Sequence, residues 1–207
     1  MITRGGMCIA MNGFAVGETI TFGRYPQRGV DAEPEPVEWI VLDIRRNAAT
    51  LISKYALDAM PYSGDEPSVT WESCRLRHWL NQDFVDVAFN DDERAMLLSV
   101  KVMAGMNPAF ETDPGNDTQD RVFLLSFEEA ERFFRSNQDR ICAATAYAKA
   151  RGAKTNRIDT CQWWLRSPGS QPDRAAYVIR IGGIYRMGGS VLTDEFAVRP
   201  VIVLGLT

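Results

Sequence analysis

Histidine is nearly absent from this chain of 207 residues, which has one, His78. Catalysis by a nucleophile and a base needs a positioned proton acceptor, most often histidine. His78 stands between Arg77 and Trp79 on a predicted helix. Nothing else in the sequence supports a Ser-His-Asp triad. We therefore interpret His78 as a helix-surface or packing residue.

Cysteines are few and scattered. The four of them form no CxxC pair, and they stand at Cys8, Cys74, Cys142 and Cys161. This spacing excludes zinc-ribbon and thioredoxin-like sites, and we expect reduced, partly buried thiols. The acidic loop at 113–120 lacks the ligand order of an EF-hand. We predict no metal site and no cofactor.

The chain also lacks a basic excess and a long apolar run. Its net charge of −4 and pI near 5.1 argue against sequence-independent nucleic-acid binding, which needs a basic surface. No segment approaches the ~18–20 apolar residues of a membrane-spanning helix. The first residues lack the pattern of a signal peptide. We expect no nucleic-acid or membrane partner and, by default, a cytoplasmic location.

Apolar periodicity predicts strands in both halves of the chain and helices between them. The strands are predicted at 18–23, 37–44, 48–53, 99–103, 121–125, 162–166, 176–181, 184–187 and 197–204. Of the two main helices, one is capped by Thr70 and the other opens with a Ser126–Glu129 capping box. The apolar face of the first is predicted from Leu76, Trp79, Leu80 and Phe84. Shorter helices are predicted at 91–98 and 145–151. This order indicates an α+β fold.

No linker or repeat divides the chain, so we predict one domain at 18–207. The preceding extension, residues 1–17, is small and weakly apolar and is a candidate for disorder.

Short sequence blocks that carry a family resemblance run along most of the chain. They are FGRYPQ at 22–27, LRHWLN at 76–81, GNDT at 115–118, VFLLS at 122–126, WWLRSPG at 163–169 and VRP at 198–200. Together they resemble a bacterial family of domains of unknown function. The closing strands also resemble the C-type lectin fold of formylglycine-generating-enzyme-like proteins and of retroelement-diversified variable proteins. The resemblance implies a mixed sheet with two main helices, in which the first and last strands pair.

The same resemblance raises the alternative of a formylglycine-generating-like metal oxidase or a related sulfur-chemistry enzyme. Formylglycine-generating enzymes hold copper with a closely spaced cysteine pair in the C-terminal half, and iron-dependent relatives need a histidine-containing triad. Here no cysteine follows Cys161, Cys142 stands far before it, and one histidine is present. Both chemistries are therefore disfavoured. Because a shared fold does not fix function, we favour a non-catalytic binding module.

The C-terminal hairpins carry the predicted binding residues. Tyrosine and arginine contribute strongly to contact energies, and glycine-rich turns present them on loops. We predict a surface that binds a protein or a surface glycan without a metal, formed by Tyr177, Arg180, Tyr185, Arg186, Leu192, Asp194 and Glu195. The alternatives are an ordinary hairpin with solvated arginines and a structural domain of a larger oligomer. A neighbouring reverse transcriptase gene would identify a variable protein of a diversity-generating retroelement.

Four further residues are predicted to have structural roles. Trp163 and Trp164 are adjacent on a strand and must point to opposite faces. One is expected in the core, and the other either in the core or on a binding surface. Arg166 and Arg199 are interpreted as hydrogen-bonded arginines that fix the loops, with recognition of an anionic group as the alternative.

Overall fold

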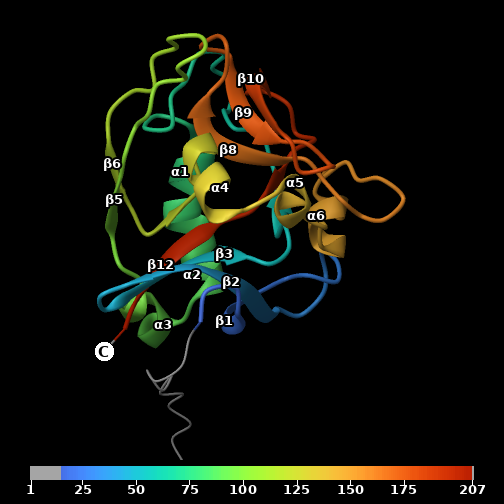
Figure 1. Cartoon of the computed structure of the whole chain (residues 1–207). Coiled ribbons are helices and arrows are strands. Elements are labelled where there is room, and N and C mark those ends of the chain that lie inside the picture. Colours follow the sequence, from blue (N-terminus) through green and yellow to red (C-terminus); the bar gives the residue numbers. More distant parts are fainter. Residues whose placement is uncertain (1–14, 207) are drawn as a thin grey trace, which may run out of the picture.

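The computed structural model describes residues 15–206 and has the predicted α+β class (Figure 1). Two five-stranded sheets have the orders β1-β2-β3-β12-β7 and β10-β9-β8-β11-β4, and β5 and β6 form a two-stranded ribbon. The strands are β1 (Thr19–Tyr25), β2 (Glu35–Arg45), β3 (Ala48–Ser53), β4 (Asp58–Ala59), β5 (Val100–Val102), β6 (Thr118–Asp120), β7 (Val122–Phe123), β8 (Trp163–Pro168), β9 (Arg174–Val178), β10 (Ile184–Ser190), β11 (Ala197–Val198) and β12 (Val201–Gly205). The predicted N-terminal extension, residues 1–17, lies almost wholly outside the described residues, and Cys8 lies outside them.

The strands predicted at 37–44 and 48–53 are confirmed as β2 and β3, which form an antiparallel hairpin, and the burial of β2 follows the period of two. Val37, Trp39 and Val41 are buried, whereas Glu38 and Ile40 between them are half-buried. The indole nitrogen of Trp39 donates a hydrogen bond of 2.7 Å to the carbonyl of Phe22, which ties β2 to β1. Buried apolar residues from both sheets form one continuous core.

The predicted last strand, 197–204, is two strands in different sheets. Its first half, β11, lies parallel to β8 and antiparallel to β4, whereas its second half, β12, pairs with β3 and β7. The break falls at Arg199–Pro200, because proline has no N–H to donate to a ladder. The implied pairing of the first and last strands is therefore wrong. β1 pairs with β2 alone among the described strands.

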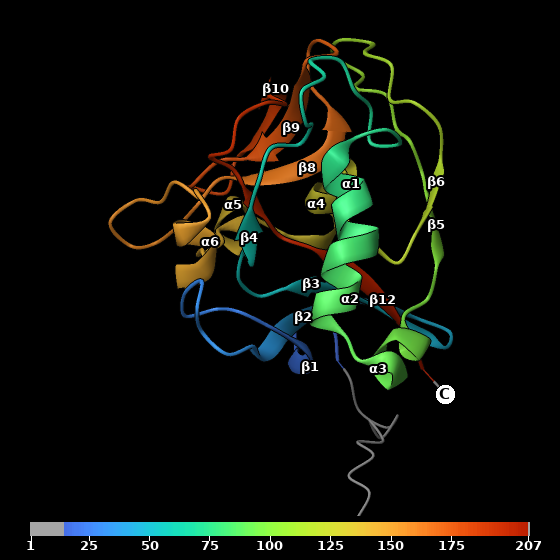
Figure 2. The ribbon, with the colours of Figure 1, turned by 180° about the vertical axis from the view of Figure 1, so that it is seen from behind.

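The first main helix is continuous through α1 (Arg75–Trp79), a π-helical turn η1 (Leu80–Phe84) and α2 (Val85–Ala88) (Figure 2). It begins after the predicted cap Thr70, because the carbonyl of Thr70 closes a separate turn with the amides of Ser73 and Cys74. Cys74 caps the helix instead. The predicted apolar face is buried at Leu76, Leu80 and Phe84, whereas its fourth member, Trp79, is half-buried.

The second main helix, α4 (Phe127–Phe133), begins with the predicted capping box. The hydroxyl of Ser126 accepts from the Glu129 amide, and the Glu129 carboxylate accepts from the Ser126 amide. The short helices are α3 (Asp91–Met96), α5 (Asn137–Arg140) and α6 (Ala146–Ala150). No helix among residues 15–206 is long and apolar enough to cross a bilayer.

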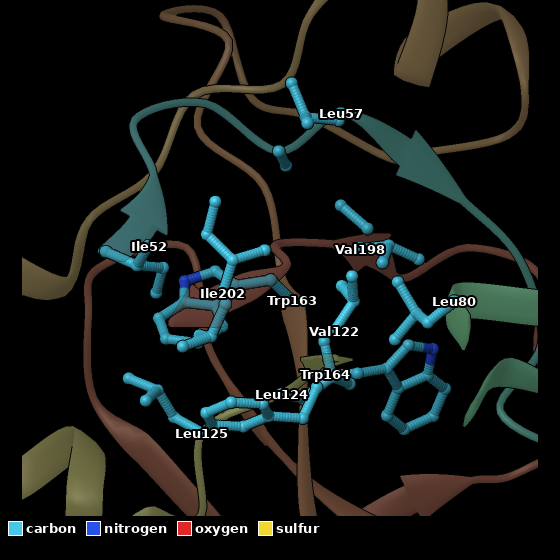
Figure 3. Close-up of a cluster of buried hydrophobic side chains, with 14 of the residues drawn as sticks. Ile52, Leu57, Leu80, Val122, Leu124, Leu125, Trp163, Trp164, Val198 and Ile202 are labelled. Atoms are coloured by element: carbon cyan, nitrogen blue, oxygen red, sulfur yellow. The ribbon is translucent and has the colours of Figure 1, made fainter. Parts of the chain in front are cut away.

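The two adjacent tryptophans of β8 are both fully buried. Their indoles point to opposite sides of the strand, and Trp164 lies on the side of Leu80 (Figure 3). Trp163 Nε1 donates to the Arg140 carbonyl and Trp164 Nε1 to the Met60 carbonyl, each over 3.1 Å. β8 thereby anchors core residues on both faces of the second sheet.

Asn81 links the first main helix to β7, and its replacement tests that link. Its Oδ1 accepts from the amides of Arg121 and Val122 at 2.8 and 3.2 Å, and its Nδ2 donates to the carbonyls of Arg77 and Val122. Each such bond contributes about 1 kcal/mol net. We expect Asn81→Ala to lower the free energy of unfolding by about 2–3 kcal/mol in urea titrations. The matched control, Gln82→Ala at the exposed next residue, should change it by less than about 0.5 kcal/mol.

Candidate functional site

Aromatic side chains form a row across β8, β9 and β10 on one face of the second sheet. The strand register places Trp164 opposite Tyr177 and Tyr177 opposite Tyr185. Their ring centroids are 6.5 and 5.3 Å apart. Phe196 packs between the strands, 4.5 Å from Trp164 and 4.4 Å from Tyr177. The row therefore leads from the fully buried Trp164 to the surface.

The outer end of the row is exposed and apolar. Tyr185 is 41% exposed, Met187 two positions along β10 is 49% exposed, and Leu192 in the following loop is 44% exposed. The Tyr185 hydroxyl lies 3.7 Å from the Met187 sulfur. Tyr177 beneath is half-buried, and this burial raises the pKa of its hydroxyl. Both tyrosines and Met187 therefore present polar and apolar surface together.

The predicted arginines do not lie with the tyrosines. Arg186 follows Tyr185 on the strand and points to the opposite face, where its guanidinium lies 4.8 Å from the Phe127 ring and 2.6 Å from the Glu131 carboxylate. Arg180 lies beyond the end of β9 and donates to the carbonyl of Lys154 at 3.4 Å. Arg186 packs on α4, and Arg180 marks one end of the surface.

The two predicted acids lie beside the loop that follows α6. Glu195 forms an ion pair with Lys154, and its carbonyl accepts from the Lys154 amide at 3.0 Å. Gly152 has a φ of +122° and packs closely against the Asp194 carbonyl. If Gly152 carried a side chain, its Cβ would lie 3.0 Å from that carbonyl oxygen. Arg180 and Glu195 consequently meet at Lys154 and form a charged border.

A loop covers the open edge of β10. Asn107 donates from Nδ2 to the carbonyls of Arg186 at 2.9 Å and Pro168 at 3.1 Å. This contact occupies an edge group that would otherwise be free to pair with another strand. Met106 and Phe110 on either side of Asn107 are exposed. The sequence gave no sign of this docking.

Arg166 is buried and occupied by protein groups. It forms an ion pair with Glu129 of α4 and donates to the carbonyl of Leu124 at 2.8 Å. Burial raises the pKa of Glu129, but the hydrogen bond and charge of Arg166 outweigh it, so the net pKa is lowered. The guanidinium thus holds α4 against β8.

Arg199 is 1% exposed and lies between aromatic rings. Its Nε donates to the Ser53 carbonyl at 2.9 Å, and its guanidinium lies 5.1 Å from the Trp163 ring and 5.4 Å from the Phe134 ring. Its Nη1 has no hydrogen-bond partner within residues 15–206. Arg199 therefore lies inside the core, away from the exposed tyrosines.

Cys142 and Cys161 lie together, contrary to the expectation from their separation in the sequence. A bridge between Ala143 and Thr160 brings their segments side by side, and the Cys161 amide donates to the Cys142 carbonyl at 2.9 Å. Burial raises the pKa of Cys142, but the hydrogen bond from the Cys161 thiol and the Arg199 charge outweigh it, so the net pKa of Cys142 is lowered. Within residues 15–206, no three His, Cys, Asp or Glu side chains are placed to hold a metal ion.

Sequence reasoning missed two members of the exposed surface. Met187 could have been found, because it shares a face with Tyr185 at a spacing of two. Phe196 gave no local signal, since it reaches the row from the loop before β11.

These features define an α+β domain whose mixed second sheet presents an aromatic and apolar face. The chain belongs to DUF6273, a domain family of unknown function, whose family model matches residues 46–206. The match begins in the turn between β2 and β3 and includes the whole second sheet. The expectation of an uncharacterised domain family is thereby confirmed. No curated protein and no solved structure matches the chain.

The Arg166–Glu129 pair makes stability depend on pH in a defined direction. The pKa of Glu129 is lower in the folded state than in the unfolded state. The pair therefore stabilises the fold fully above the unfolded pKa near 4.5, and this stabilisation is lost as pH falls through the folded pKa. We expect Glu129→Gln, which retains the cap, to lower the free energy of unfolding at pH 7 by about 1–2 kcal/mol. The difference from wild type should begin to narrow as pH falls below about 4.5 and should disappear once pH is below the lowered folded pKa of Glu129.

Urea titrations between pH 3 and 8 measure this effect, with Glu128→Gln as the matched control at the exposed neighbour. A deficit of Glu129→Gln that is the same at every pH would show that packing, and not the charge pair, stabilises this position.

Proposed function

We propose that the chain is a non-catalytic binding module that holds a protein or glycan ligand on the outer face of β9 and β10. The contact residues are Tyr177, Tyr185, Met187 and Leu192, with Arg180, Asp194 and Glu195 at the border. The observation that carries the proposal is the aromatic row, which ends in the exposed ring of Tyr185. Arg186 supports the sheet from its other face.

The energetics favour a binding role for this surface. Exposed apolar area costs about 25 cal/mol per Å² relative to its burial, so the uncovered rings represent free energy that a partner can recover. The Tyr185 ring packs against the Tyr177 ring at a tilt, and this contact restricts its motion before binding. Less side-chain entropy is then lost in a complex. Tyrosine and methionine are also enriched at protein interfaces.

We extend the proposal to a C-type-lectin-like fold. The mixed order β10-β9-β8-β11-β4 and the two main helices support it. The lack of the implied pairing between the first and last strands, β1 and β12, speaks against it. An experimental structure compared with formylglycine-generating-enzyme-like and retroelement-diversified proteins decides this point. The related proposal of a variable protein is tested by searching the neighbouring genes for a reverse transcriptase and a near-repeat of the segment that codes for 176–196.

A sulfur-chemistry enzyme is the second candidate, and the proximity of the free thiols of Cys142 and Cys161 favours it. Both thiols are buried, so a substrate has no path to them in this structure. Binding is therefore the stronger proposal. Copper or iron in stoichiometric amount in the purified protein, lost in Cys142→Ser, would reverse this order.

Photo-crosslinking in cells tests the binding surface. We expect benzoylphenylalanine at position 185 to give a discrete protein adduct, because the ring is exposed within the proposed interface. Met187→Asp in the same chain should reduce the adduct by at least about tenfold, since a buried unpaired charge opposes binding. The probe at Thr21, exposed on β1 in the other sheet, is the matched control.

Absence of an adduct at position 185, or the same adduct from position 21, would overturn the protein-ligand form of the proposal. A glycan array then decides the sugar form. Array binding that persists in EDTA and is lost in Tyr185→Ala would identify a glycan ligand, and no binding in either assay would refute the proposed function.

A further inference from the structure

A cavity of about 240 Å³ is lined by none of the residues of the aromatic row. Its lining residues come from β1, β4, the first main helix and α6, or directly follow these elements, whose course can be followed in Figure 2. The volume is several times the ~30 Å³ share of one water molecule. It is below the ~300–1,000 Å³ of pockets for drug-sized ligands. The cavity therefore suits a small ligand.

One wall of the cavity is a continuous chain of four aromatic rings. Trp79 lies 5.5 Å from Phe84, Phe84 lies 5.1 Å from Tyr25, and Tyr25 lies 5.5 Å from Tyr147. Phe84 and Tyr25 are buried and hold the wall in place, whereas Trp79 and Tyr147 are half-buried. The cavity is thus lined by aromatic rings from three separate elements.

The charges around the wall are predominantly negative. Asp58 is buried, and its carboxylate accepts from the Tyr25 hydroxyl at 2.6 Å and from Arg151 Nε at 3.3 Å. Burial, the largest effect, raises the pKa of Asp58. Asp83 is exposed at the cavity and has no ion-pair partner within residues 15–206. Arg151 offsets Asp58, and Asp83 leaves an excess of one negative charge.

We infer that this cavity binds a small organic cation, such as a substituted ammonium group, against the aromatic wall and beside Asp83. A cation placed over Trp or Tyr is attracted by the negative face of the ring. The unpaired carboxylate adds a Coulomb attraction to a group that also has apolar substituents. Trp79 is the ring expected to contribute most, because indole is the strongest of these partners.

Asp58 and Arg151 have a positioning role in this site. The Tyr25 hydroxyl is held by Asp58, which fixes the middle of the wall, and Arg151 compensates the buried carboxylate. A neutral ligand of the same shape would gain the apolar contacts but not the attraction to the rings and to Asp83. The charge of the ligand is therefore the property that separates this proposal from a merely apolar cavity.

Isothermal titration calorimetry with two isosteric probes tests the inference at constant ionic strength. Choline has the quaternary ammonium group, and 3,3-dimethylbutan-1-ol replaces its nitrogen by carbon and has no charge. We expect choline to bind the full chain saturably and about three- to thirtyfold more tightly than the alcohol, the range that a cation–π contact supplies. Equal affinities, or no binding of choline up to tens of millimolar, would overturn the inference.

Variants locate the binding. We expect Asp83→Asn to weaken choline about threefold or more and to leave the alcohol unchanged, and Trp79→Leu to weaken choline more strongly. Asp86→Asn removes one charge from the same helix outside the cavity, where Asp86 pairs with Arg94, and should have no effect. Unfolding curves establish that each variant is folded. An equal loss in Asp83→Asn and Asp86→Asn would mean that only the general charge of the helix matters, which contradicts a site in the cavity.

Discussion

The two sheets depend on one segment that belongs to both of them, residues 197–205. Val198 in β11 accepts from the Leu57 amide at 2.9 Å, and the Pro200 carbonyl accepts from the Ser53 amide at 3.0 Å. Arg199 between them donates back to the Ser53 carbonyl. Because the chain changes sheets within these three residues, the orientation of β8 relative to the first sheet is fixed. Because β9 pairs with β8 and β10 pairs with β9, the orientation of the aromatic face on β9 and β10 is fixed as well.

Local features of the fold could be predicted, and partners distant in the chain could not. The Ser126 capping box, the β2–β3 hairpin and the buried helix face are encoded within a few residues of one another. Pro200 is a local signal that the predicted strand 197–204 is interrupted, because proline has no N–H to donate to a neighbouring strand. Packing decides which sheet β11 and β12 each join. Cys142 and Cys161 meet through a bridge that no spacing rule contains.

The candidate surface shows the same limit. Period-two alternation places Tyr177 with its partners and also separates Arg186 from Tyr185, so grouping these two in one surface contradicted the strand pattern itself. Phe196 and the Asn107 contact depend on loops whose course the sequence leaves open. The cavity lined by Trp79 is harder still to predict from the sequence. Its walls come from four elements, and no single stretch of the chain contains more than a few of its residues.

The shared segment also determines when the protein can fold. During synthesis β3, β4, β7 and β8 leave the ribosome before residues 197–205, so the edges that β11 and β12 will cover are open on the nascent chain. The contact between Ser53 and Arg199 spans 146 positions, and such non-local closure is slow. Both sheets are completed in one late step, which leaves apolar strand edges exposed to aggregation until then.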